Sequence, residues 1–148
     1  MIVNYDEHGW RIITQRCHGL LAGQICAHWA SVDRQERWAE ILIATTEHDD
    51  VFNEFERNPL IDHNGSPLNY KMMGFDEGAS KRLINMALTK SRLIALLISR
   101  HISFTHGKEA SAKSFLNRLT KKELHWLREA GIKKADADSA YNQGPIRI

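Results

Sequence analysis

Residues 91–104, which read SRLIALLISRHISF, are the most apolar stretch of this chain. The length of the stretch and the spacing of its apolar residues are typical of a buried α-helix, so we predict a central helix over residues 91–105. The stretch is shorter than the ~18 apolar residues that a membrane-spanning helix needs. We therefore expect the rest of the domain to pack around this helix, and we expect no membrane partner.

Four further segments have apolar residues at helical spacing and are predicted to be helices: residues 15–30, 34–49, 76–89 and 109–130. Thr14 is the expected N-cap of the first of these helices, with Leu21 and Ile25 on its inner face. Asp33 and Glu36 have the spacing of a capping box at the start of the second. The sequence thus predicts a mainly α fold.

Two short β-branched or aromatic runs, residues 2–5 and 10–14, precede the first helix and flank a turn that contains Gly9. This pattern predicts a short N-terminal β-hairpin. With 148 residues, the chain is long enough for one domain with a real core. We predict a single helical domain over residues 1–135 and a flexible tail over residues 136–148.

Residues 57–75 break the helical pattern, because Pro59, Gly65 and Pro67 interrupt any helix. A loop of this length is uncommon in a compact domain unless it serves a purpose. Two interpretations stay open: a lid or wall of a functional site, or an ordered excursion packed by its own apolar residues.

Charge is unevenly distributed. Residues 1–74 hold six Lys and Arg against 11 Asp and Glu, whereas residues 75–148 hold 14 against seven, which gives net charges of −5 and +7. The asymmetry is explained either by solvated helix faces or by a basic rim that attracts a small phosphate-bearing ligand. No known nucleic-acid-binding motif accompanies it, so a nucleic-acid partner is not expected.

The N-terminal ten residues have acidic side chains where a signal peptide needs basic ones, so we expect a cytoplasmic location. Cys17 and Cys26 would lie nine positions apart on one helix, too far for a disulfide. We expect both to be reduced and to lie in or near the core.

Three predicted helices carry side chains that bind metals. His48 and Asp49 close the second helix, His18 lies in the first turn of the first, and His101 lies near the end of the central helix. The spacing of each histidine from apolar residues places it on an inward face. Imidazole and carboxylate together favour a divalent ion such as zinc, iron, nickel or manganese. We predict that His18, His48, Asp49 and His101 are metal ligands.

Arg100, next to His101, is the candidate for binding the phosphate of a substrate, because its guanidinium can contact two oxygens at once. Arg100 could equally pair with the acidic first half of the chain. Likewise, the histidines could be hydrogen-bonded core residues and Glu47 to Asp50 an acidic helix end. We found no phosphate-binding glycine loop or dinucleotide motif.

Three motifs occur in order along the chain: an opening MIV…GW.IITQ..H..LAGQIC.HW, then ATTEHDD, then LLISRHISF. In these motifs the chain resembles the bacterial domain-of-unknown-function family 3891, through about Leu116. This resemblance implies a fold but no activity.

His18 and the pair His48–Asp49 also resemble the first two elements of the HD-domain metal phosphohydrolases, which are all-helical. The later aspartate of that pattern has no counterpart here, and His101 stands roughly where it would be. The resemblance implies an HD-like arrangement and metal-assisted hydrolysis of a phosphate ester or nucleotide. The alternative is a non-catalytic helical module that binds a small anion or a protein partner and has core histidines.

Overall fold

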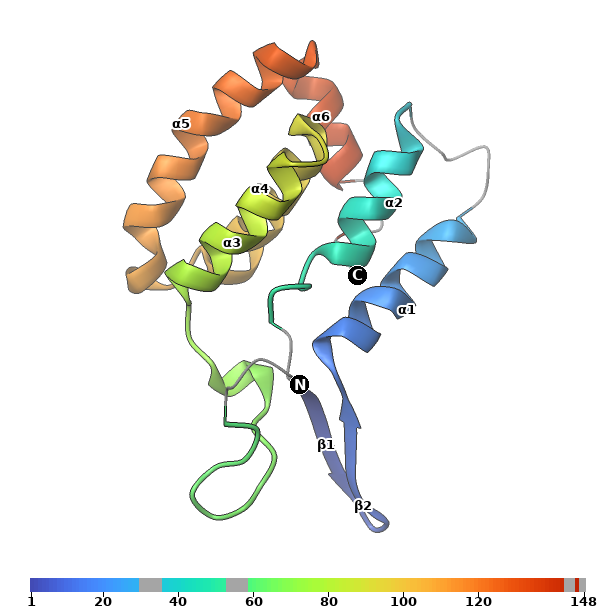
Figure 1. Cartoon of the computed structure of the whole chain (residues 1–148), viewed down its shortest axis with the longest axis vertical. Coiled ribbons are helices and arrows are strands. Elements are labelled where there is room, and N and C mark those ends of the chain that lie inside the picture. Colours follow the sequence, from blue (N-terminus) through green and yellow to red (C-terminus); the bar gives the residue numbers. More distant parts are fainter. Residues whose placement is uncertain (30–35, 53–58, 143–145, 147–148) are drawn as a thin grey trace.

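The computed structural model describes all residues except 30–35, 53–58, 143–145 and 147–148. A β-hairpin leads into a set of helices, as the sequence predicts (Figure 1). The named elements are β1 (Ile2–Asp6), β2 (Gly9–Ile13), α1 (Gln15–Ala27), α2 (Trp38–Glu47), the 3-10 helix η2 (Tyr70–Met72), α3 (Glu77–Leu88), α4 (Arg92–His106), the 3-10 helix η3 (Ala110–Ala112), α5 (Lys113–Ala130) and α6 (Lys134–Asn142).

Helix α4 is the predicted central helix and contacts α2, α3, α5 and α6. Ser91 caps its start, since the Ser91 hydroxyl accepts a hydrogen bond from the Ile94 amide at 3.1 Å. Every residue from Leu93 to Ser99 is buried, and so is Ile102. Removal of this apolar surface from water is the main stabilisation of the fold.

Helices α1 and α2 pack against each other through small residues. A β-carbon at Gly19 would lie 2.4 Å from the main-chain oxygen of Thr46, and one at Gly23 would lie 2.2 Å from the Thr46 hydroxyl. The predicted inner face of α1 is therefore wrong. Leu21 and Ile25 are 50% and 42% exposed, because a close approach of two helices leaves no room for large side chains.

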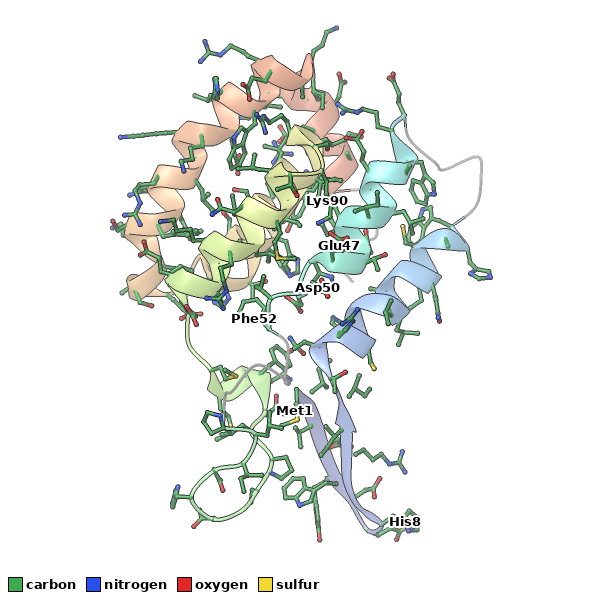
Figure 2. All side chains as sticks on the ribbon, in the orientation of Figure 1. Met1, His8, Glu47, Asp50, Phe52 and Lys90 are labelled. Carbon is green, nitrogen blue, oxygen red and sulfur yellow. The ribbon has the colours of Figure 1, made fainter. Side chains whose placement is uncertain are left out.

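Helix α2 does not start at the predicted capping box. It begins at Trp38, after Arg37 in the left-handed conformation with φ of 63°, and Arg37 forms an ion pair with Glu40. Asp33 lies outside the described residues, whereas Glu36 precedes the helix. At the other end of the helix, Glu47 pairs with Lys90 at 2.9 Å and so links α2 to the end of α3 (Figure 2).

The segment from Pro59 to Phe75 folds back onto β1. The Tyr70 amide donates to the Met1 carbonyl at 2.7 Å, and the Asn69 side chain donates to the Val3 carbonyl at 2.9 Å. The predicted loop is thus held against the N-terminal strand. The hairpin itself pairs Ile2 with Ile13 in antiparallel register.

The predicted flexible tail differs from the structure over residues 136–142, which belong to α6. Ala137, Ala140 and Tyr141 are buried, and the Tyr141 hydroxyl donates to the Arg100 carbonyl at 3.2 Å. Small residues and one aromatic ring suffice to dock this short helix on α4, although they give a weak periodic signal in the sequence.

Within the described part of the chain, no helix combines the length and the apolar character needed to cross a membrane. Both cysteines are thiols, as predicted: Cys26 is buried, but Cys17 is exposed rather than near the core.

Candidate metal centre

The start of α1 fixes the position of His18. Thr14 is the N-cap, as predicted, and its hydroxyl accepts from the Cys17 amide at 3.2 Å. His18 is therefore in the first turn, where it is partly buried, and the adjacent Gly19 brings this turn against α2. The close contact of Gly19 with the main chain of Thr46 places His18 beside the end of α2.

His48 is the C-cap of α2 and is only 2% exposed. Its Nδ1 lies 2.7 Å from the carbonyl oxygen of Thr45, so this nitrogen carries the proton and donates. The lone pair of the neutral ring is consequently on Nε2. Hydrogen bonding of one ring nitrogen to a carbonyl is the usual way in which a metal-binding histidine is oriented.

Asp49 lies beside the second ring nitrogen of His48, with its Oδ2 3.3 Å from His48 Nε2. Gln15, a buried residue of α1, donates to the same oxygen at 3.1 Å. Gln15 was not predicted. It precedes His18 by three positions, so the helical spacing that selected His18 also places Gln15 on the same face.

His101 reaches the same place from α4. Its ring centroid is 4.7 Å from that of His48, and its Nε2 is 4.0 Å from Asp49 Oδ1. The rings of His18 and His48 are 5.1 Å apart. The structure thus brings together the four side chains that the sequence analysis selected from three separate helices.

Burial and mutual charge set the protonation of the cluster. Burial lowers the pKa of His101 to about 4, and the neighbouring His48 adds to this effect. Burial also lowers the pKa of His18, again with help from His48. Both rings are therefore neutral near pH 7 and have a lone pair to offer.

His48 and Asp49 behave as a pair. Burial opposes the charge on both, but their hydrogen bond and mutual attraction outweigh it, so the pKa of His48 is raised and that of Asp49 is lowered. His48 and Asp49 share a proton across this contact, and the same two side chains would hold a metal ion in place of that proton.

The cluster offers imidazole and carboxylate groups of the kind that divalent transition metals prefer, and His101 lies just outside the closest group of three. One ligand atom from each of His18, His48 and Asp49 lies within 4.8 Å of the other two. Ligands of one ion lie about 3 to 4 Å apart, given bonds near 2 Å, so the three side chains would have to move closer together to hold an ion. Nitrogen-rich ligation favours zinc, iron, nickel or manganese over magnesium.

The cluster lines a cavity of about 600 Å³. Apolar side chains from the loop, among them Leu60, Leu68, Tyr70 and Met73, form one side of it, so the loop is a wall of the site. This agrees with the first of the two interpretations of the sequence. Met1 and Phe52, which are labelled in Figure 2, line the cavity from the start of β1 and from beyond the end of α2.

Arg100 is not brought to the cluster. Its Nη2 pairs with Asp138 Oδ1 of α6 at 2.7 Å, and its Nε is 4.0 Å from Glu123 Oε2 of α5. The cation that does line the cavity is Arg82 of α3, which has no ion-pair partner among the described residues. Arg82 was missed because nothing in its local sequence distinguishes it from other surface arginines.

Two of the remaining histidines lie in different surroundings. His106 at the end of α4 lines the cavity, whereas His8 lies at the exposed tip of the hairpin, far from α2 and α4 (Figure 2). His106 was not among the predicted ligands, and its spacing from His101 places it on a different face of the helix.

A family model described as "Protein of unknown function (DUF3891)" matches residues 1–143, so the chain belongs to this family. The resemblance based on the three sequence motifs is thereby confirmed. No curated protein and no solved structure matches the chain. The resemblance to HD-domain phosphohydrolases therefore rests on His18, His48 and Asp49 alone.

Proposed function

We propose that this protein is a metal-dependent hydrolase of small phosphate esters. The family to which it belongs has no assigned activity, so the proposal rests on the site. The observation that carries the proposal is the convergence of His18, His48, Asp49 and His101, from three helices, at the wall of a cavity of about 600 Å³. A cavity of this size suits a small-molecule ligand.

The chain's own residues supply the framework of the site. Thr45 holds the His48 ring with Nε2 available, and Gln15 holds one oxygen of Asp49. A divalent ion bound there would lower the pKa of a coordinated water and polarise a phosphoryl oxygen. The apolar loop wall would shield the reacting atoms from bulk water, which strengthens electrostatic interactions inside the cavity.

The lining of the cavity supports an ester with one anionic and one apolar part. Arg82 is the residue that we assign to the phosphate, in place of Arg100, because Arg82 faces the cavity and Arg100 is paired elsewhere. Leu60, Leu68 and Met73 would contact the apolar part. A nucleotide or an aryl or alkyl phosphate meets both requirements.

The test starts with elemental analysis of protein purified without a histidine tag. About one equivalent of a transition metal per chain and hydrolysis of p-nitrophenyl phosphate are the expected results. His101→Gln should lose both, whereas His8→Gln, at the tip of the hairpin, should lose neither. Metal-free protein that stays metal-free after incubation with zinc, iron, nickel and manganese would refute the proposal.

One observation favours the alternative of a non-catalytic module with core histidines. His48 is buried and already satisfied by the Thr45 carbonyl, as a structural histidine would be. That alternative requires neither metal nor turnover, so the same experiment separates the two. A protein that binds inorganic phosphate without metal and hydrolyses no ester would support it.

A further inference from the structure

A second polar group faces the cavity and plays no part in the proposed metal site. His106, the last residue of α4, lines the cavity, and its Nδ1 lies 2.6 Å from Glu109 Oε1. The other oxygen of Glu109 accepts from the Phe75 amide at 2.8 Å. The carboxylate is thus held at both ends, once by the histidine and once by the main chain.

The arrangement fixes which nitrogen of His106 is available. Because Nδ1 donates to Glu109, Nε2 is the ring nitrogen that can exchange a proton with a ligand. The Phe75 ring packs against the imidazole edge-to-face, with centroids 5.4 Å apart, and restricts its rotation. A histidine oriented by a carboxylate is the arrangement from which enzymes build a general acid or base.

The position of His106 relative to the cluster also suits this role. His106 follows His101 by five positions, which places them about 7.5 Å apart along the helix axis and about 140° apart around it. His106 is therefore displaced from the ligand cluster but borders the same cavity. A phosphate ester that spans the two positions would present its leaving oxygen to His106.

We propose that His106 is the general acid of the proposed hydrolase and that Glu109 is its positioning residue. This inference rests on the proposed function. A water molecule attacks phosphorus and releases one proton to solvent as the new P–O bond forms. The P–O bond to the leaving group breaks, and the leaving oxygen takes the proton from Nε2 of protonated His106. His106 then recovers a proton from solvent, with Nδ1–H still bound to Glu109.

The structure offers a matched control pair. His125 and Glu129 lie on α5 with His125 Nε2 3.2 Å from Glu129 Oε1, but the His125 side chain is 64% exposed and does not line the cavity. The pair has the same two residue types on one helix face. It provides no route for a proton to a ligand in the cavity.

The test compares three aryl phosphates of increasingly poor leaving group: 2,4-dinitrophenyl, p-nitrophenyl and phenyl phosphate. General acid catalysis typically contributes about 10²- to 10⁴-fold. We expect His106→Gln to lower kcat by that factor for phenyl phosphate and only slightly for the dinitrophenyl ester, which needs no proton. Glu109→Gln should show the same trend with a smaller loss. Metal content should be unchanged in both variants, and His125→Gln should behave as wild type.

A second measurement does not depend on turnover. In ¹⁵N spectra of the metal-free protein, His106 should have its proton on Nδ1, and Glu109→Gln should shift the ring toward a mixture of tautomers. Titration with inorganic phosphate should move the His106 resonances and leave those of His125 in place.

Different outcomes overturn different statements. Equal losses of kcat on all three esters, or no loss on any, with an active wild type would refute the role of His106 and leave the metal site standing. If metal-loaded wild type hydrolyses none of the esters, the hydrolase proposal fails and the general acid fails with it.

Discussion

At the scale of single residues, the hydrogen bonds of the cluster decide which atoms can bind a ligand. The Thr45 carbonyl holds Nδ1 of His48, so Nε2 is directed at Asp49, and Gln15 then restrains the Asp49 carboxylate. Neither Thr45 nor Gln15 is a ligand candidate itself. Thr45 and Gln15 instead restrain the His48 ring and the Asp49 carboxylate, so these two side chains would lose less conformational freedom if an ion were bound.

Asp49→Asn should lower metal occupancy and leave folding nearly unchanged, since an amide is a far weaker ligand of nearly the same shape. Metal stoichiometry measured together with a melting curve tests this. Asp50→Asn is the matched control, because Asp50 is the neighbouring carboxylate (Figure 2) and does not line the cavity. Equal stoichiometry in the two variants would count against Asp49 as a ligand.

Arg82→Ala should weaken binding of inorganic phosphate to the metal-loaded protein. A hydrogen bond to a charged group contributes about 1.5 to 3 kcal/mol, and the exposure of Arg82 places the loss at the lower end, about tenfold in Kd. Calorimetric titration measures it. Arg82→Lys should recover only part of the affinity, because an ammonium cannot contact two oxygens in a fork.

Arg100→Ala, in contrast, should leave the affinity for phosphate unchanged and lower the stability of the fold. The loss of Arg100 removes the partner of Asp138 and leaves the partly buried Glu123 without its nearest cation. We expect the free energy of unfolding to fall by about 2 kcal/mol, less than for a fully buried pair because Asp138 is half-exposed. Urea denaturation measures this loss. A weaker affinity of Arg100→Ala for phosphate would show that Arg100 takes part in phosphate binding after all.

At the scale of elements, the packing of α1 on α2 sets the geometry of the cluster. Gly19 meets main-chain atoms of Thr46, which cannot move aside, whereas Gly23 meets the Thr46 side chain, which can rotate. The two glycines therefore differ in what a substitution would do, although both lie on the same face of one helix.

Gly19→Ala should destabilise the fold by about 1 to 3 kcal/mol and lower metal affinity, because the added methyl group forces α1 away from α2. Gly23→Ala should have a smaller effect, and Thr46→Ala should rescue Gly23→Ala but not Gly19→Ala. Denaturation curves of the single and double variants measure the coupling. An equal rescue of both would show that the main-chain contact does not limit the approach of the helices.

The helices and the ligand cluster were predictable because they depend on local periodicity. Thr14, Asp76 and Ser91 cap helices close to the predicted starts, and His48 and His101 follow from spacing along single helices. His18 was selected from its spacing to Leu21 and Ile25, which are exposed, so that part of the argument was wrong although His18 does meet the cluster. The partners were not predictable. Arg82 meets the cavity, and Arg100 meets Asp138, through contacts between distant segments that spacing along one helix does not encode.

At the scale of the whole molecule, a polar network joins α4 to the C-terminal helices α5 and α6. The Ser99 hydroxyl donates to Glu123 Oε1 at 2.6 Å, Arg100 pairs with Asp138, and Tyr141 donates to the Arg100 carbonyl. The most apolar helix of the chain is thus fixed to α5 and α6 by its few polar residues. These contacts add to the burial of Ala137, Ala140 and Tyr141 in docking α6 on α4.

This network should make stability depend on pH. Burial raises the pKa of Glu123, and the Ser99 hydrogen bond offsets this only in part. A carboxyl group with a raised pKa in the folded state contributes stability below its unfolded pKa and loses it as the pH rises through the folded pKa. The free energy of unfolding should therefore fall less between about pH 4.5 and 7 in Glu123→Gln than in wild type.

Urea denaturation across that range measures the slope. Glu77→Gln, which changes an exposed carboxylate on α3, should keep the slope of the wild type. If the Glu123→Gln and wild-type curves run parallel, Glu123 does not cause the pH dependence.

The main-chain contact at Gly19 also has an evolutionary consequence. Because backbone atoms set the distance between His18 and His48, the outer face of α1, with Leu20, Leu21 and Ile25, can accumulate substitutions without moving the two rings. We therefore expect stricter selection at Gly19 than at the large hydrophobic residues of the outer face. In divergent relatives of this chain, α1 should therefore be recognisable by a glycine at the position of Gly19 rather than by leucines on its outer face.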